Sequence, residues 1–237
     1  MGKATSFPYL IIGSGRAATH FKHYLALKGI PYADWNRKEY TEDELQECLA
    51  RATHVLLLIK DSAIREFRDQ HLQNFKGTVL HFSGSLTVEG IESFHPLMTF
   101  GPSLYDLKFY EKIYFAAQSK ERFRKCFPKL ANPVFELKAE NKAFYHALCV
   151  MSGNFPQILW HECLLAFDEL NIPTAALSLY LHKNLENFMA NPKQSLTGPL
   201  ARKDWQTIQN NIDALPDRLK PLYSAFVDFY LPNGGKS

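Results

Sequence analysis

The run GSGRAA at residues 13–18 has the residue types and spacing of a turn that binds a phosphate group. Such a turn needs a glycine for the tight bend, a second where the backbone approaches the phosphate, and a small residue where helix meets strand; Gly13, Gly15 and Ala18 fill these positions. Free N–H groups and the dipole at the start of the next helix then face the anion. The predicted ligand-binding residues are Gly13, Ser14, Gly15, Arg16, Ala17 and Ala18. The alternative is a glycine turn in an α/β domain that binds no nucleotide.

The choice of nucleotide depends on the end of the second predicted strand. An acidic residue there binds the ribose of NAD, whereas an arginine accommodates the 2′-phosphate of NADP. If the strand ends at Trp35, then Asn36 and Arg37 face the ribose and Lys38 adds a second cation, which predicts NADP(H) as cofactor. An end one residue earlier would place Asp34 at the ribose and favour NAD. Alternatively, the two cations belong to a solvated turn.

Polar residues follow two further apolar runs, at 55–59 and 79–82. Lys60 follows the first run, and Ser83 and Gly84 follow the second. Ligands of open α/β sheets bind at the carboxyl ends of the strands, so we expect these three residues to line the cofactor. The alternative is a pair of capped strand-to-helix turns.

Hydride transfer to a carbonyl or an imine also needs a proton donor and groups that polarise the acceptor, and a histidine or an amide can serve. The candidate catalytic residues are His146, Asn154 and His95. His146 shares a helix face with Gly153, and Asn154 lies roughly 80° round that helix at 100° per residue. Ser152 on the same stretch is a candidate for substrate binding. The alternatives are a turn stiffened by proline for His95 and a buried, hydrogen-bonded role for His146.

A second candidate for substrate binding, Arg202, lies in the segment 197–204, which is predicted to be a loop between helices. Asp204 is a plausible N-cap of the next helix, whereas the arginine has no such local role. Its guanidinium could clamp a substrate carboxylate or reach the backbone carbonyls of a partner.

The elements that must position these residues change in character near residue 139. Before it, short β-rich runs alternate with helical stretches, which predicts an α/β domain with a Rossmann-type parallel sheet over residues 1–138. After it, helical patterns at 140–170, 174–190, 204–214 and 216–230 predict an all-α C-terminal domain over residues 139–237 for substrate binding and dimerisation. Apolar residues crowd the stretch 175–189 beyond what one face would bury, so this helix is either central or a subunit interface.

Composition excludes several classes of protein. A formal charge of +3 on 237 residues is too small for a nucleic-acid-binding footprint, and no window is long and apolar enough to cross a membrane. We therefore expect a cytoplasmic protein with a small-molecule substrate. The four cysteines form no C-x-x-C pair, and the stretch HECLL at 161–165 has leucine where a zinc-protease helix has its second histidine, so no metal site is expected.

Several motifs together carry a resemblance to a known family: GSGRAA, WNR, LLLIKDSAI, HFSGSLT, HPLMTF and LTGPLARKDW. With these the chain resembles Rossmann-like proteins with a C-terminal DUF2520 domain. That family is related to pyrroline-5-carboxylate reductase and to coenzyme-F420-dependent NADP reductases, within the 6-phosphogluconate-dehydrogenase-like group. The resemblance implies an NADP-binding domain, a helical domain that forms a homodimer, and a substrate cleft between the domains. Related dehydrogenases often place a lysine and an asparagine on the first long helix of the second domain; here Lys142 is poorly placed relative to Asn154.

The function that the sequence favours is an NADP-dependent oxidoreductase acting on a small metabolite. The alternatives are a non-catalytic NADP(H)-binding sensor and an interaction protein with a vestigial Rossmann domain. Neither the substrate nor the direction of the reaction follows from the sequence.

Overall fold

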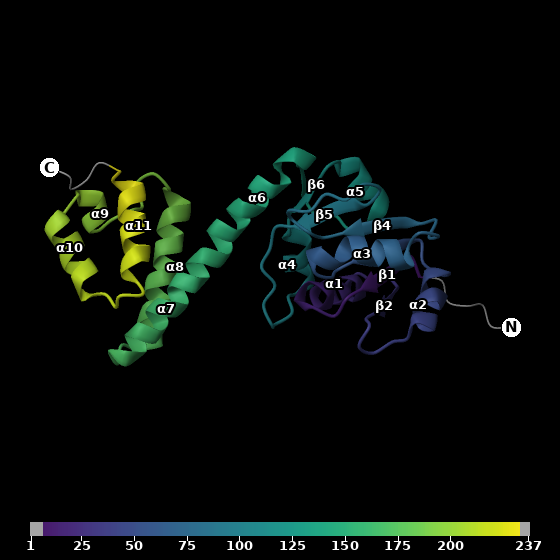
Figure 1. Ribbon diagram of the computed structural model, residues 1–237, viewed down its shortest axis with the longest axis horizontal. Helices are drawn as coiled ribbons and strands as arrows, with labels where there is room; N and C mark the ends of the chain where they lie inside the picture. Colours follow the sequence, from purple (N-terminus) through teal and green to yellow (C-terminus); the bar gives the residue numbers. More distant parts are fainter. Residues whose placement is uncertain (1–6, 233–237) are drawn as a thin grey trace. The chain divides into compact units, whose positions relative to one another are not determined.

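A computed structural model describes residues 7–232 of the chain. It divides into two compact units, Met1–Ile158 and Leu159–Ser237 (Figure 1). The last strand ends at Glu136, close to the change of character expected from the sequence. The first helix of the helical part nevertheless packs with the sheet, so the boundary between the units falls later in the chain than residue 138.

The first unit is built on a seven-stranded sheet in the order β2-β1-β3-β4-β5-β6-β7. The five strands from β2 to β5 are parallel, β6 is antiparallel to β5, and β7 is parallel to β6. This confirms the predicted fold class, a Rossmann-type sheet followed by helices. The strands are β1 (Tyr9–Ile12), β2 (Tyr32–Trp35), β3 (His54–Leu57), β4 (Thr78–His81), β5 (Glu92–Pro96), β6 (Phe115–Ala117) and β7 (Val134–Glu136).

The strand β5 corrects the alternative that placed His95 in a turn stiffened by Pro96. His95 pairs with Ala116 in the ladder, and the proline is the last residue of the strand. The pairing continues past the proline, because the Leu97 N–H donates to the Tyr114 carbonyl at 2.9 Å. Pro96 lies opposite Phe115 between two bonded positions, so its missing N–H removes no bond to that neighbour. The side chain of Phe94 is fully buried, which ties the strand to the core.

Helices cover both faces of the sheet. Alternate residues of β1 point to opposite faces, so Tyr9 and Ile11 join one buried cluster while Leu10 and Ile12 join another. The first cluster includes side chains of α1 and α5, and the second includes side chains of α2 and α3. The helices of this unit before the last strand are α1 (Arg16–Leu27), α2 (Glu42–Leu49), α3 (Asp61–His71), α4 (Leu107–Lys112) and α5 (Lys120–Cys126).

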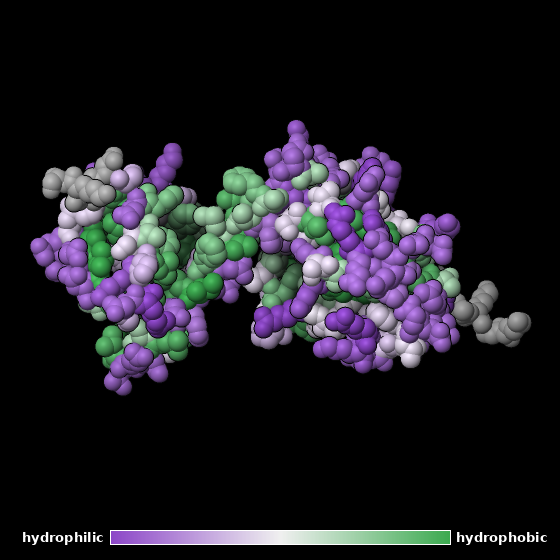
Figure 2. Space-filling view, in the orientation of Figure 1, coloured by the Kyte–Doolittle hydropathy of each residue, from purple (hydrophilic) through white to green (hydrophobic). Residues whose placement is uncertain are grey.

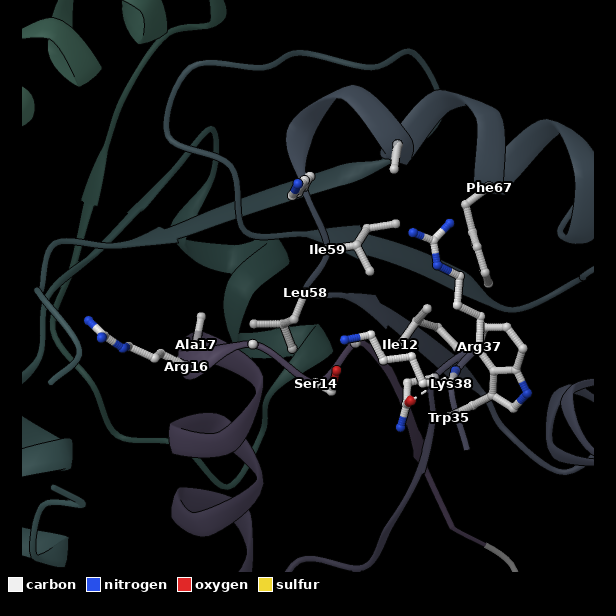
Figure 3. A pocket seen from close by; sticks show the side chains of 15 residues that line it. Ile12, Ser14, Arg16, Ala17, Trp35, Arg37, Lys38, Leu58, Ile59 and Phe67 are labelled. Carbon is white, nitrogen blue, oxygen red and sulfur yellow. Dashed lines mark hydrogen bonds between the residues drawn. The ribbon is translucent and has the colours of Figure 1, made fainter. Parts of the chain in front are cut away.

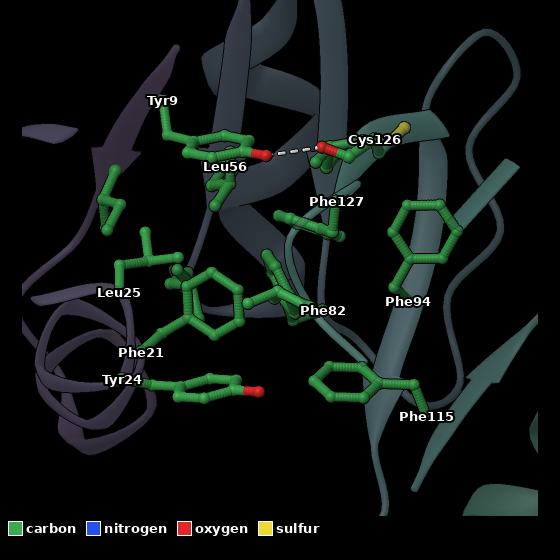
Figure 4. Packing of buried hydrophobic residues seen from close by; sticks show 14 of the residues in the cluster. Tyr9, Phe21, Tyr24, Leu25, Leu56, Phe82, Phe94, Phe115, Cys126 and Phe127 are labelled. Atoms are coloured by element: carbon green, nitrogen blue, oxygen red, sulfur yellow. Dashed lines mark hydrogen bonds between the residues drawn. The ribbon is translucent and has the colours of Figure 1, made fainter. Parts of the chain in front are cut away.

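The first cluster is rich in aromatic rings, as Figure 4 shows. Phe127 packs edge-on against the rings of Phe21 and Phe94, and the Tyr9 hydroxyl donates to the Cys126 carbonyl at 2.7 Å. That hydrogen bond satisfies the one polar atom that the tyrosine brings into the core. The first unit therefore has a hydrophobic core of its own.

The helix predicted over 140–170 is interrupted. A short 3₁₀ turn (Ala139–Asn141) leads into α6 (Lys142–Cys149), a π-helical turn (Val150–Asn154) follows, and α7 (Phe155–Glu169) continues the helix. A π turn has i→i+5 hydrogen bonds, so the 100° step per residue does not hold across it. The predicted angular relation between His146 and the residues at 153 and 154 is therefore wrong.

The second unit is helical, with the end of α7 followed by α8 (Thr174–Ala190), α9 (Pro199–Arg202), α10 (Trp205–Ala214) and α11 (Lys220–Tyr230). The helix α9 lies inside the segment that was predicted to be a loop. Gly198, with φ +87°, turns the chain, and Pro199 starts the helix at a position that needs no N–H donor. Asp204 caps α10 as predicted, because its carboxylate accepts from the Thr207 N–H at 3.1 Å.

Candidate functional site

The glycine turn after β1 has the geometry that phosphate binding requires. Gly13 has φ +131°, and a Cβ there would lie 2.3 Å from the Leu58 carbonyl oxygen, so no other residue fits this position. A Cβ on Gly15 would meet nothing within 4 Å, so the backbone is open to an approaching group. Gly15 is also the N-cap of α1, and no side chain caps that helix. The first N–H groups of α1 are thus left for an anion.

A hollow of about 510 Å³ opens beside this turn (Figure 3). Its lining comes from the ends of three parallel strands and includes the glycine turn 13–17, the segment 35–38 after β2 and the segment 58–60 after β3. Ile59, Ala63 and Phe67 give one part of it an apolar surface. The arrangement offers backbone N–H groups for phosphates and an apolar wall for a flat ring.

Four cationic side chains line the hollow without a partner. Within residues 7–232, the side chains of Arg16, Arg37, Lys38 and Lys60 make no hydrogen bond or ion pair. Unpaired cations around a concave surface attract a polyanion. All four are named in the sequence analysis, and all four line the hollow.

The strand end on which the nucleotide prediction depended is confirmed. β2 ends at Trp35, and Asp34 lies outside the hollow, where its carboxylate accepts from the Lys22 ammonium at 2.9 Å. Asn36 lines the hollow, but its side chain is used inside the turn, where its amide donates to Glu39 and its oxygen accepts from the Lys38 N–H. The side chains of Arg37 and Lys38 are therefore the groups of this turn that are available to bind a ligand.

A second polar region lies at the ends of β4 and β5, on the same unit. Ser83 donates from its hydroxyl to Asp61 at 2.5 Å, and Ser85 donates to the same carboxylate at 3.3 Å. Asp61 is the first residue of α3, so this contact joins the loops that follow β3 and β4. The predicted lining residues Ser83 and Gly84 thus lie in this second region and are not part of the lining of the hollow, whereas Lys60 is.

Lys142, the first residue of α6, is the centre of this region. Its side chain is buried, with 4% of the residue exposed, and its ammonium donates to the Ser83 carbonyl at 3.1 Å and to the Ser93 hydroxyl. Burial lowers the pKa of Lys142 to about 8, and the charge of Asp61 acts in the opposite direction. The sequence analysis considered Lys142 only in relation to Asn154. Its hydrogen-bond partners Ser93 and Ser83 instead lie 49 and 59 residues earlier in the chain.

Two of the three predicted catalytic residues meet in the same region. The imidazole rings of His95 and His146 are 5.9 Å apart, and both lie over Gly84. A Cβ on this glycine would lie 2.4 Å from His146 and 3.0 Å from His95 Nε2, so the close approach requires glycine. The Tyr145 hydroxyl is 2.8 Å from His95 Nδ1.

Burial determines the charge of the histidines in this region. It lowers the pKa of His95 to about 4, and the electrostatic effects of the neighbouring His146 and Lys142 act in the same direction. Burial also lowers the pKa of His81, at the end of β4, to about 4. Both imidazoles are therefore neutral near pH 7. The Nε2 atom of His81 is buried without a hydrogen-bond partner.

The remaining predicted residues do not join this cluster. Ser152 donates to the Leu148 carbonyl at 2.8 Å within its own helix, and Asn154 is exposed in the π turn. Arg202 is exposed in α9 of the second unit. Over residues 7–232, no group of three or more metal-binding side chains comes together, and no helix is long and apolar enough to cross a membrane.

Comparisons with known proteins support the fold and the resemblance. Residues 116–228 match the family model described as a domain of unknown function, DUF2520, which confirms the resemblance that the motifs indicated. No curated protein matches the chain.

Solved structures share the fold at low sequence identity. A proposed NADP oxidoreductase from Bacteroides fragilis is 22% identical over 96% of this chain and 99% of its own, with a TM-score of 0.78. A protein from Thermotoga maritima is 20% identical over 94% and 96%, with a TM-score of 0.66. The pyrroline carboxylate reductase of Plasmodium falciparum, solved with NADP bound, is 11% identical over 97% and 100%, with a TM-score of 0.56.

Proposed function

We propose that this chain, a Rossmann-type sheet continued by a DUF2520 domain, is an NADP(H)-dependent oxidoreductase that transfers a hydride between its cofactor and a small metabolite. The observation that carries the proposal is the hollow beside the glycine turn, which is lined by an uncapped helix start and by four unpaired cations. The structural relatives whose descriptions name NADP support the same cofactor.

The residues present fit NADP(H) better than NAD(H). The glycine turn and the start of α1 would hold the pyrophosphate, and the apolar wall around Phe67 would hold the adenine. Arg37, Lys38 and Lys60 would meet the 2′-phosphate, which NAD(H) lacks. Asp34, the group that would have bound an unmodified ribose, is paired with Lys22 instead.

Proton transfer would be carried out by the residues around Lys142. A bound nicotinamide would supply the hydride, and the ends of β4 and β5 lie on the same edge of the sheet as the nucleotide hollow. Lys142 has a pKa of about 8, so its ammonium can release a proton at neutral pH and regain one from solvent. His95 and His146 lie near enough to bind or orient the same substrate.

The test is a calorimetric titration of the full chain with NADPH and with NADH. Replacing Arg37 by glutamine removes a charge-assisted contact of about 1.5–3 kcal/mol, so we expect the Kd for NADPH to rise about tenfold or more. The Kd for NADH should not change. Lys108→Gln, a matched loss of charge on exposed α4, is the control. Equal affinity of the unmodified chain for both cofactors would contradict the NADP(H) assignment.

We further propose that the protein acts as a homodimer. Five large apolar residues spaced three and four apart along α6, the π turn and α7 are exposed: Phe144, Leu148, Met151, Phe155 and Ile158. A second copy of the chain is the partner that the resemblance implies, and large apolar side chains exposed together mark an interaction site.

Light scattering tests the dimer. The chain of 27.2 kDa should have twice that mass in solution, and Phe155→Asp should restore the mass of one chain. Gln157→Asp, an exposed residue of the same helix that is not one of the five, should leave the dimer intact. A monomer at every concentration would refute the proposal.

A further inference from the structure

The geometry around Lys142 points to a substrate class: we propose that the site takes an aldehyde or a ketone, or the alcohol in the reverse direction, and not an imine. The substrate oxygen would accept from the Lys142 ammonium and from the Nε2–H of His95, which Tyr145 holds in that orientation. This inference rests on the proposed oxidoreductase function, and it concerns only residues of the first unit.

The Lys142 ammonium has one N–H group left with which it could donate a hydrogen bond to a ligand. An ammonium carries three N–H groups, and the Ser83 carbonyl and the Ser93 hydroxyl use two of them. Beside the ammonium lies a void of about 10 Å³ whose lining includes Lys142, Ser93, His95 and Gly84. A void of about this volume holds a single water-sized atom. The space thus accepts one oxygen atom between donors.

Tyr145 determines which nitrogen of His95 carries the proton. Burial keeps the imidazole neutral, so only one of its nitrogens bears a hydrogen. Burial and the neighbouring Cys149 raise the pKa of Tyr145, so its phenol keeps its proton. That hydroxyl lies 2.8 Å from His95 Nδ1, and a ring nitrogen is a better acceptor than the thiol of Cys149. The hydroxyl therefore donates to Nδ1, and Nε2, beside Gly84, is left with the hydrogen.

The need for a proton distinguishes the two substrate classes. In the reduction of a ketone, the carbonyl carbon gains the hydride with its electron pair, and the C–H bond of the reduced nicotinamide breaks. The C=O π pair becomes a lone pair on oxygen, which takes a proton from Lys142 Nζ, and solvent returns a proton to the amine. An iminium ion already carries its proton, so its reduction to an amine needs no acid.

Charge favours the same class. An iminium ion is a cation, and the charged group that lines the void is the Lys142 ammonium. The other lining residues are neutral, and several of them are apolar: Gly84, Ser93, His95, Ala116, Ala117, Gln118 and Leu137. Asp61 is the carboxylate whose charge acts on both Lys142 and His95, but its oxygens accept from the hydroxyls of Ser83 and Ser85. A neutral carbonyl avoids repulsion by Lys142 and gains two hydrogen bonds, of which one is charge-assisted.

The test follows the ¹⁵N signals of the histidine side chains by NMR in the full chain saturated with NADPH. The probes are isobutyramide, a carbonyl that is not readily reduced, and pyrrolidinium, a cation with the shape of a cyclic iminium ion. Binding of NADPH is measured first in the same sample, so a failure of the proposed function is seen separately. We expect His95, assigned with His95→Gln, to be the Nε2–H tautomer and to shift with isobutyramide only.

Three variants test the roles of Lys142 and Tyr145. Lys142→Met removes a charge-assisted hydrogen bond, so the Kd for isobutyramide should rise about tenfold, whereas the exposed Lys138→Met should leave it unchanged. Tyr145→Phe should give a mixture of His95 tautomers. The measurement on the unmodified chain decides even if a variant does not fold. An Nδ1–H tautomer, a response to pyrrolidinium, or no response of His95 to isobutyramide in the NADPH complex would each overturn the inference.

Discussion

The two units of the chain differ in how many of their large apolar side chains are buried. In the sheet unit the large apolar residues form two buried clusters, one on each face of the sheet. In the described part of the helical unit, the buried apolar residues are Leu177, Ile208 and Val227.

Large apolar side chains of the helical unit instead reach the surface, where Figure 2 shows green hydrophobic patches among the hydrophilic residues. Phe229 is 86% exposed, Leu179 73% and Met189 71%. Exposed apolar surface on this scale marks an interaction site. The difference teaches that the sheet and its covering helices are stabilised by their own packing. The helical unit needs a further surface to cover it, as does the exposed apolar row along α6, the π turn and α7.

The largest expected effect is the change in the free energy of unfolding when one phenylalanine in each unit is replaced by alanine. Phe123 is fully buried in the first cluster, so Phe123→Ala should lower the free energy of unfolding by about 3–5 kcal/mol. Phe229→Ala should change it by less than about 0.5 kcal/mol in a single chain, because the ring is exposed. Chemical denaturation at several protein concentrations measures both. A large loss for Phe229→Ala that grows with concentration would show that a second copy covers the ring.

The next effect concerns pH and the buried histidines of the sheet unit. Burial lowers the pKa of His95 to about 4 in the folded chain, whereas an exposed histidine of the unfolded chain has a pKa of about 6.5, so the unfolded chain binds the extra proton first as the pH falls. Stability is therefore full above pH 6.5 and declines toward pH 4, by at most about 1.4 kcal/mol per pH unit for each such group.

Denaturation between pH 7 and pH 4.5 measures this slope. His95→Gln should reduce it, whereas His182→Gln, at an exposed position of α8, should not. An unchanged slope in His95→Gln would contradict the burial of a neutral imidazole at this site.

A smaller effect tests the packing of the two imidazoles against the loop after β4. A methyl group on Gly84 would lie 2.4 Å from His146, so Gly84→Ala should destabilise the chain by about 1–3 kcal/mol. Gly153→Ala is the matched control, because a Cβ there meets nothing within 4 Å. Thermal unfolding of both variants checks the prediction, and equal stability would mean that the histidines do not approach the loop this closely.

The smallest effect compares a helix cap in each unit. Thr41 caps α2 and Asp204 caps α10 by accepting from backbone N–H groups, so replacement by alanine should cost about 1 kcal/mol in either case. If the helical unit unfolds separately, Asp204→Ala should advance only its transition, as hydrogen exchange of its amides would show. Loss of protection in the sheet unit as well would indicate that the two units unfold together.

Local patterns predicted the parts of the molecule that depend on neighbours in sequence. The glycine turn, its helix and the end of β2 at Trp35 were all predicted, because strand, turn and helix are contiguous there. The N-cap at Asp204 was predicted for the same reason. Strand β5 was missed as a strand because its proline favours a turn locally, and only pairing with β4 and β6 made it extended.

The sequence by itself determined the Rossmann-type sheet, the helical second half and the cations that line the hollow beside the glycine turn, since these follow from periodicity, turn chemistry and short spacing. Only the tertiary structure decided the chemistry around Lys142. Burial lowers the pKa of its ammonium, and its hydrogen-bond partners come from the loop after β4 and from β5, 59 and 49 residues earlier in the chain. No local pattern encodes such contacts, because desolvation and pairing arise only when distant strands and helices pack together.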